Sequence, residues 1–459
     1  MEARRHGGAE GGGEADADHV LAGHRATPLR GSPFARNAPA IGVAIVYGVA
    51  SIVWLAAGQV LPGGRWLVTH LFTLGVLTTL LWSFSRNFAA RFTGVGDLRE
   101  PVAATWGLTL LLGASITATV TGRAVGAHWP LVIGSSGIML VIAANLVTLR
   151  RLRARARNDR FLWVVHRYED AHVVFLVAAG LGGALGSGLV PGEVYLGARE
   201  AHIHLNVLGW AGLTVLTTLV VFGPALLRVR IEAGAEKRAS DAVTRAMIGL
   251  GVGALGLVLR SLGRSIGDGA EGPATVLLVA GMAVYLQAVI VVAIPLLRAA
   301  RDHDRSPLRF SLAAVVIWLP VGVAIDTVLL MTGQPGWSVG LAVALLIGVF
   351  AQLILAVLLY VTPMLRGRDF ASRDVLIART EQLPRTRTAT LNLGVVLVLV
   401  ADLTPGLAEI PAQALMRVGW ALVIVAAVAH LAVALWPLGR IDPGRVRSAA
   451  AARYRGPPG

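Results

Sequence analysis

The chain alternates apolar stretches with short polar breaks from about residue 39 to residue 437. Each stretch is roughly 18 to 28 residues long, which suits a helix that crosses ~30 Å of hydrocarbon. Twelve such stretches are present, and we expect each to be a transmembrane helix. Their predicted spans are 39–61, 65–86, 103–122, 129–149, 161–189, 200–227, 243–264, 274–297, 309–332, 337–365, 388–405 and 413–437.

Polar tails flank this region. Residues 1–38 are rich in Gly, Ala and charged side chains without periodicity, which predicts a disordered cytoplasmic tail. Residues 438–459 form a second, basic tail that we also expect in the cytoplasm. The sequence therefore predicts one polytopic transmembrane domain over residues 39–437, folded as an all-α bundle of about twelve helices.

The distribution of basic residues indicates the orientation of the bundle. The chain has 41 Lys and Arg against 26 Asp and Glu, a formal net charge of +15. Thirty-five of these bases lie in the tails or in the loops that follow even-numbered spans. The six others are Arg65, Arg123, Arg199, Arg260, Arg264 and Arg417. This positive-inside bias places both termini in the cytoplasm.

The same distribution of basic residues explains the net positive charge of the chain by its membrane topology. A basic chain could bind nucleic acid, but here the excess charge follows the membrane topology. Anionic headgroups of the lipid bilayer are a sufficient partner for it, so we expect no nucleic acid. Hydrophobic residues make up 55% of the chain and charged residues only 15%, which excludes an ordinary soluble fold.

The absence of cysteine restricts the chemistry of any metal site. Without cysteine the chain has no disulfide, thiolate-bound haem, iron–sulfur cluster or cysteine-based zinc site. A bound metal would therefore need His, Met or carboxylate ligands. Imidazole suits copper, iron and haem, and polar side chains inside a membrane span are functional candidates because they are costly to bury there.

Three histidines near the outer ends of two predicted helices form the main candidate site. The helices at 65–86 and 200–227 both contain His-Leu-x-x-Leu-Gly, starting at His70 and His204. Both helices run from the outside inward, so these two histidines lie at matching depth. With His202 close by, the pattern predicts a haem or copper site formed by these three side chains.

Geometry limits how these ligands can act together. His202 and His204 are two residues apart, about 200° around a regular helix, so one of them should face elsewhere unless the helix is irregular. Asn206 shares the face of His202. His128 lies on the same outer side and is a further candidate metal ligand. Asp326 is a lone acid at similar depth in the span 309–332.

The remaining intramembrane histidines have simpler interpretations. His166 and His172 lie in the segment HRYEDAH, which we interpret as a solvated helix entry, with His166 paired to Asp170 at i, i+4. His430 stands alone in the last predicted span, and we expect a hydrogen-bonded core residue.

Four helical segments carry a resemblance to a known family. They are HLFTLGVLTTLLW (70–82), AHIHLNVLGWAGLTVLTTL (201–219), AQLILAVLLYVTPMLRGRD (351–369) and LNLGVVLVLV (391–400). These segments resemble the NnrS-type membrane domains, an actinobacterial "copper oxidase" membrane protein family, and the layout of twelve spans resembles haem-copper oxidase subunit I. The resemblance implies that His70 is an axial haem ligand and that His204 or His202 is a copper ligand.

The chain also departs from the oxidase pattern. Subunit I needs histidines on helices 7 and 10, and the predicted spans 243–264 and 337–365 contain none. The helix 6 tyrosine of an oxygen-reducing site is also missing, because Val207, Leu208 and Trp210 follow His204. The sequence therefore argues against a proton-pumping terminal oxidase.

Three functional hypotheses follow. The first is a haem- or copper-binding protein of the bacterial cell membrane with a redox or ligand-binding role in nitrogen-oxide or copper metabolism. It would be a candidate oxidoreductase, with a periplasmic or extracellular copper redox protein as its partner. The second is a secondary transporter in which Asp326 and the histidines form a proton or metal-ion pathway, although the two six-helix halves show no convincing similarity. The third is a structural membrane subunit that has lost metal binding.

Overall fold

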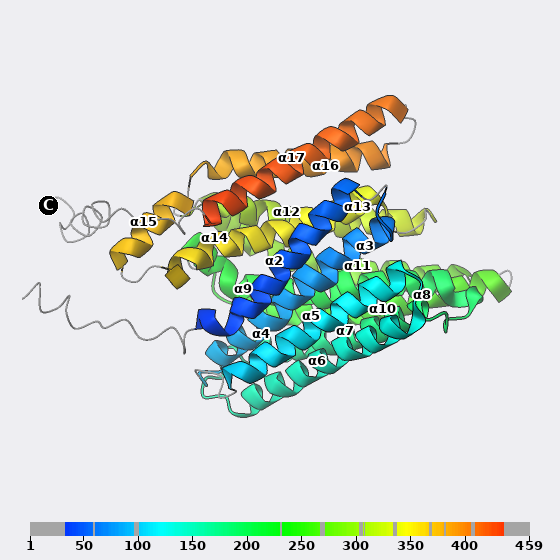
Figure 1. The fold of residues 1–459 in the computed structure, drawn as a ribbon, viewed down its shortest axis with the longest axis horizontal. Helices are drawn as coiled ribbons and strands as arrows, with labels where there is room; N and C mark the ends of the chain where they lie inside the picture. The colour runs from blue at the N-terminus through cyan, green and yellow to red at the C-terminus, as the bar shows by residue number, and fades with distance from the viewer. Residues whose placement is uncertain are drawn as a thin grey trace, which may run out of the picture.

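The computed structural model describes residues 33–57, 60–95, 101–229, 232–266, 271–302, 306, 308–333, 337–366, 370–380, 382–404 and 409–435. Over these residues the chain is an all-α bundle, and twelve helices are long and apolar enough to cross a membrane (Figure 1). This confirms the expected fold class and the expected number of spans. The predicted tails lie outside the described residues except for residues 33–38, which belong to the first helix.

Nine of the twelve described spans are single helices. They are α2 (Pro33–Ala57), α5 (Val102–Ala124), α6 (His128–Ala154), α7 (Leu162–Gly186), α10 (Ala235–Ile266), α11 (Glu271–Asp302), α12 (Arg309–Met331), α16 (Pro384–Leu403) and α17 (Glu409–Leu435). A short helix, α15 (Phe370–Thr380), lies between the tenth and eleventh spans and was not predicted.

The other three spans are interrupted by a π-helical segment. The second span consists of α3 (Gly64–His70), η2 (Leu71–Thr78) and α4 (Thr79–Phe92); the sixth of α8 (Gly192–His204), η3 (Leu205–Gly212) and α9 (Leu213–Leu227); and the tenth of α13 (Val339–Leu345), η4 (Leu346–Ala351) and α14 (Gln352–Arg366). π-Helical turns are rare and often mark functional sites. Two of them begin directly after His70 and His204.

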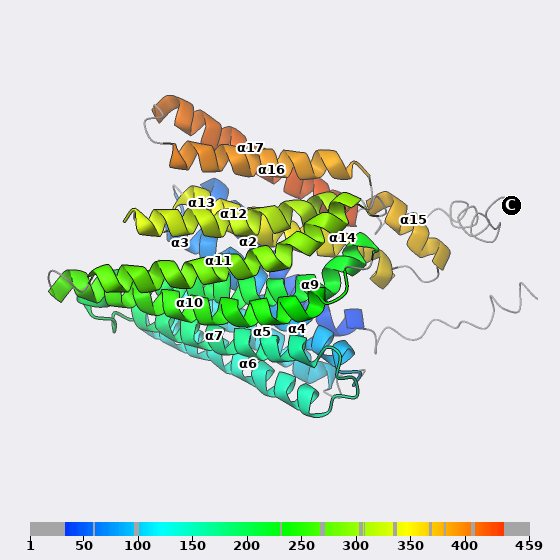
Figure 2. The same ribbon diagram turned by 180° about the vertical axis from the view of Figure 1, so that it is seen from behind.

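These interruptions recur every fourth span, and so does the packing. Each π segment packs against the span before it: η2 against α2, η3 against α7, and η4 against α12. The two spans after each interrupted span form a tight antiparallel pair: α5 with α6, α10 with α11, and α16 with α17 (Figures 1 and 2). The described chain is therefore built from three successive four-span units, which explains why a comparison of two six-span halves finds no similarity.

Glycines allow the tight pairs to approach closely. In α10 and α11, a Cβ atom on Gly281 would lie 2.4 Å from the carbonyl oxygen of Gly249. In α16 and α17, a Cβ atom on Gly394 would lie 2.7 Å from the carbonyl oxygen of Gly419. Without hydrophobic driving force inside a bilayer, helices associate through such backbone contacts between small residues.

The three interrupted spans meet in the middle of the bundle. The ring of Phe222 in α9 lies 5.5 Å from that of Phe88 in α4 and 5.3 Å from that of Tyr360 in α14. The indole Nε1 of Trp210 in η3 donates to Oγ1 of Thr78 in η2 at 3.2 Å. The sixth span is the most buried of the twelve. The span that carries His202 and His204 is therefore the central helix of the bundle.

The two ends of the bundle differ in charge. The described chain enters at the start of α2 and leaves at the end of α17 at the same end (Figure 1), and the other even-numbered spans also finish there. We call this the Arg-rich end. The helices α3, α8 and α13 lie at the opposite end, which we call the Arg-poor end (Figure 1). Of these, α3 carries His70 and α8 carries His202 and His204.

Candidate functional site

His70 and His202 form a pair at the Arg-poor end. His70 is the last residue of α3, and His202 lies in α8. Their ring centres are 6.5 Å apart and their ring planes are nearly parallel, with an angle of 13°. Both residues are half-buried. The fold thus brings together two of the three predicted ligands, one from the second span and one from the sixth.

Backbone carbonyls fix the tautomer of both rings. Nδ1 of His70 lies 2.8 Å from the carbonyl oxygen of Trp66, and Nδ1 of His202 lies 2.8 Å from the carbonyl oxygen of Ala178. A carbonyl oxygen only accepts, so each Nδ1 must carry the proton and donate it. Each Nε2 then keeps its lone pair. Metal-binding histidines are commonly oriented in this way.

Neighbouring side chains hold the two rings in position. The indole of Trp66 stacks on His70 with ring centres 4.0 Å apart, and the Arg123 guanidinium lies 5.8 Å from the centre of the indole ring. The amide of Asn206 donates to the carbonyl oxygen of His202 at 2.7 Å, on the face expected from the sequence. A Cβ atom on Gly182 of α7 would lie 2.4 Å from Cε1 of His202, so this glycine leaves the space that the ring occupies.

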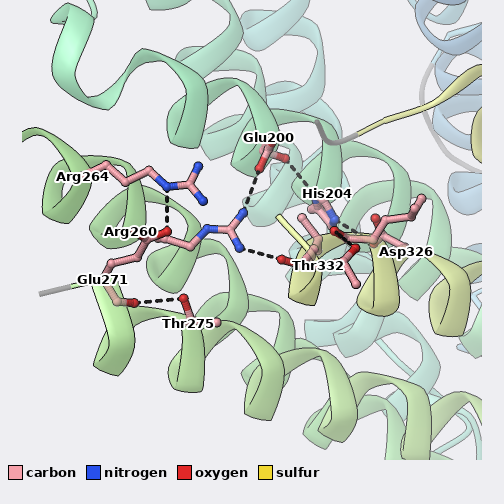
Figure 3. Close-up of polar contacts among 10 residues, drawn as sticks. Glu200, His204, Arg260, Arg264, Glu271, Thr275, Asp326 and Thr332 are labelled. Carbon is pink, nitrogen blue, oxygen red and sulfur yellow. Dashed lines mark hydrogen bonds and ion pairs between the residues drawn. The ribbon is translucent and has the colours of Figure 1, made fainter. Parts of the chain in front are cut away.

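His204 faces a different neighbour (Figure 3). Its Nδ1 donates to the carbonyl oxygen of Glu200 at 2.7 Å, and its Nε2 lies 2.7 Å from Oδ2 of Asp326 in α12. The side chains are only 2% and 1% exposed. Because both ring nitrogens are engaged, His204 is not part of the pair formed by His70 and His202. The spacing of the two histidines in α8 had indicated this separation.

Charged groups connect this buried contact with the Arg-poor surface. Arg260 of α10 donates to the carbonyl oxygen of Leu330 at 2.7 Å and lies 3.8 Å from the carboxylate of Glu200. Further out, Arg264 pairs with Glu271 at 2.7 Å, and both side chains are nearly half exposed (Figure 3). Two ion pairs, Arg264 with Glu271 and Arg260 with Glu200, therefore lie between the surface and the contact of His204 with Asp326.

The remaining predicted ligand lies apart. His128 is the exposed first residue of α6, and its ring makes an edge contact with Trp129 at 5.9 Å. In the part of the chain that the structure describes, no group of three or more His, Cys, Asp or Glu side chains could hold a metal ion. The described site is thus a pair of imidazoles rather than a cluster of four ligands.

His172 was misjudged from the sequence, because it is not part of a solvated helix entry. It is fully buried, its Nδ1 donates to the carbonyl oxygen of Tyr168 at 2.6 Å, and its Nε2 accepts from Nδ2 of Asn145 at 2.7 Å. The ring also meets Trp210 edge-on at 4.7 Å. The missed signal is a helical stripe of Tyr168, His172 and Phe175, all fully buried, on one face of α7.

Two simpler interpretations are confirmed. His166 lies 3.9 Å from Asp170 one helical turn later, and its side chain is about half exposed. His430 is buried and its Nδ1 donates to the carbonyl oxygen of Ala426 at 2.7 Å, as expected for a hydrogen-bonded core residue.

Together, the fold and the site define a multi-pass, all-α membrane protein with a histidine pair near the Arg-poor end. No protein-family model matches this chain, and no curated protein matches it.

Proposed function

We propose that this chain is a haem- or copper-binding protein of a bacterial cell membrane, with a redox or ligand-binding role in nitrogen-oxide or copper metabolism. The observation that carries the proposal is the pair formed by His70 and His202, whose ring centres are 6.5 Å apart. A metal ion bonded at about 2.0–2.1 Å to one nitrogen of each ring would give about this separation of the ring centres with the two nitrogens turned toward each other.

The donor set fits both kinds of metal group. Each imidazole offers a neutral Nε2, because its Nδ1 donates to a backbone carbonyl. Neutral imidazole binds copper and haem iron without the thiolates that this chain lacks. Copper or haem iron held there would supply one-electron chemistry or, where a coordination position stays open, binding of a small ligand such as nitric oxide.

The resemblance to NnrS-type domains and to haem-copper oxidase subunit I supports the same residues. In that resemblance the second and sixth helices each supply a histidine. For the sixth helix we assign this role to His202 rather than His204, since Nε2 of His204 already contacts Asp326. Because the predicted spans 243–264 and 337–365 lack the histidines of helices 7 and 10, we do not propose a proton-pumping oxidase.

The position of the histidine pair suits electron exchange with a partner protein outside the membrane. With the Arg-rich end in the cytoplasm, the histidine pair lies near the outer surface. Trp66 stacks on His70 and in turn lies beside Arg123, so an aromatic ring and a cation lie next to His70. A periplasmic or extracellular copper redox protein would approach this end of the bundle.

Metal analysis and absorption spectroscopy of the protein purified from membranes test this proposal. We expect a Soret band or stoichiometric copper, and we expect His70→Ala and His202→Ala each to abolish it. His128→Ala is the matched control, because this histidine is exposed and its ring contacts Trp129, and the substitution should leave the metal content unchanged. A colourless, metal-free protein would refute the proposal and favour a structural subunit.

A further inference from the structure

A cavity of about 330 Å³ lies at the Arg-rich end, between the end of α6 and the start of α7. Its lining residues are Arg150, Arg153, Ala154, Leu162, Trp163 and His166. The cavity thus combines cationic side chains with a tryptophan and two apolar side chains. It is at the opposite end of the bundle from His70 and His202, so it has no part in the proposed metal site.

A buried carboxylate holds the two arginines at this cavity. Nε and Nη2 of Arg153 donate to the two oxygens of Glu169 at 2.7 and 3.1 Å, and Nε of Arg150 lies 4.0 Å from the same carboxylate. The Glu169 side chain is only 6% exposed, whereas Arg150 and Arg153 remain 58% and 43% exposed. One carboxylate fixes two guanidinium groups, so the pair keeps a net positive charge toward solvent.

The other acidic group nearby does not cancel this charge. Asp170 lies 3.9 Å from Nε2 of His166 but only 2.8 Å from Nη1 of Arg167, which neutralises it. His166 itself is 51% exposed. The cavity therefore offers a positively charged rim on which an anion could make charge-assisted hydrogen bonds.

An exposed apolar surface extends from this cavity along both helices. On α6, Val147, Leu140 and Ile133 follow one another at intervals of seven residues and are 44%, 63% and 66% exposed. On the neighbouring α7, Val173 and Val177 are 43% and 58% exposed. In a membrane-spanning bundle such a surface contacts acyl chains, and Val147 lies one helical turn from Arg150. The cavity is thus at the headgroup end of a lipid-facing surface.

We propose that this cavity binds the headgroup of an anionic phospholipid. The phosphodiester accepts hydrogen bonds from Arg150 and Arg153, Trp163 packs beside the glycerol region, and the acyl chains lie along the exposed residues of α6 and α7. A zwitterionic lipid is disfavoured because its ammonium group would approach the guanidinium groups. A soluble phosphate lacks the acyl chains that the apolar surface contacts. Basic pockets between transmembrane helices are suited to such lipids.

Native mass spectrometry of the purified protein, supplied with equal amounts of phosphatidylglycerol and phosphatidylcholine, tests the site. We expect the wild-type chain to retain phosphatidylglycerol preferentially, and Arg150→Gln/Arg153→Gln to reduce that preference about tenfold. Arg238→Gln/Arg301→Gln is the matched control, because these arginines are also exposed at the Arg-rich end and each pairs with a carboxylate, Glu232 or Asp302. The control should keep the wild-type preference.

A second variant separates lipid binding from folding. Arg153→Gln removes the bidentate partner of buried Glu169 and could therefore weaken the fold. Arg150→Gln/His166→Gln leaves that contact intact, because it alters only side chains that are more than half exposed. It should also lose preference for the anionic lipid. Glycerophosphoglycerol, which has the headgroup without acyl chains, should not displace the bound lipid. Equal binding of both lipids, equal loss in the control, or displacement by the soluble headgroup would overturn the proposal.

Discussion

Nε2 of His204 lies 2.7 Å from Oδ2 of Asp326, and this contact joins the sixth span to α12 where both side chains are almost fully buried. Nδ1 of His204 carries a proton that it donates to the carbonyl oxygen of Glu200, so the contact with Asp326 requires one further, shared proton. The two side chains together are then neutral overall. This neutrality allows a carboxylate to lie inside a membrane-spanning helix.

The contact predicts a strong dependence of stability on Asp326. Removing one member of a buried pair leaves the other uncompensated, so Asp326→Ala should lower the free energy of unfolding by about 3–5 kcal/mol. Thermal unfolding in detergent measures this loss. His204→Leu/Asp326→Leu should recover most of it, since replacing both members removes the unpaired charge. Asp302→Ala, at an exposed ion pair, is the control with an expected effect within about 0.5 kcal/mol.

Gly182 provides a test of the metal site that leaves both histidines in place. In Gly182→Ala the new Cβ would lie 2.4 Å from Cε1 of His202, so the ring must move away from its position opposite His70. We expect loss of bound haem or copper in the purified protein, while the helical content stays that of the wild type. Gly180→Ala in the same helix is the control, because its Cβ would meet only Cε of Met139 at an ordinary 3.6 Å. Equal metal content in the two variants would contradict the assignment of His202.

The sequence predicted the fold well because the relevant signals are local. The length of each apolar stretch and the side on which each arginine falls do not depend on how helices pack, and the number of spans is confirmed. The π-helical segments were not predicted, since hydropathy does not distinguish a π turn from an α turn in a uniformly apolar stretch such as 346–351. The period of four spans depends on these segments and on the tight pairs, so it became visible only in the structure.

The candidate site was predicted less completely, for a physical reason. The sequence identified His70, His202 and His204, but which face of α8 meets α3 depends on the rotation of the helix in the bundle. That rotation is fixed by residues distant in the chain, including the Ala178 carbonyl that binds His202 and the Asp326 carboxylate that contacts His204. His172 was missed because the charged residues Glu169 and Asp170 made the segment look solvated, whereas Glu169 is itself buried on the same side of α7 as His172.

The tight packing of α10 against α11 predicts that alanine substitution of two glycines, Gly281 and Gly251, changes stability by different amounts. Gly281→Ala would bring a Cβ within 2.4 Å of the carbonyl oxygen of Gly249 and 2.5 Å of the amide nitrogen of Gly253, both backbone atoms that cannot move independently. The helices must separate, and we expect a loss of about 1–3 kcal/mol in stability. Gly251→Ala in α10 meets nothing within 4 Å and should be neutral or slightly stabilising. Thermal unfolding of the two variants side by side measures the contrast, and similar midpoints would show that the close approach contributes little.

The buried hydrogen bond between Asn145 and His172 allows a double-mutant test of the polar core. Nδ1 of His172 already donates to the Tyr168 carbonyl, so Nε2 needs a donor, and the Asn145 amide supplies it at 2.7 Å. Asn145→Leu leaves that nitrogen buried without its donor, and we expect a loss of about 1–2 kcal/mol in the free energy of unfolding.

Asn145→Leu/His172→Phe removes both partners and should lie closer to the wild type than the sum of the two single variants, because no buried nitrogen then lacks its partner. The four unfolding free energies, measured under one detergent condition, give the interaction energy directly. Additive effects of the two substitutions would show that the amide and the imidazole contribute independently, and that His172 is held in α7 by its contacts with Tyr168 and Trp210 alone.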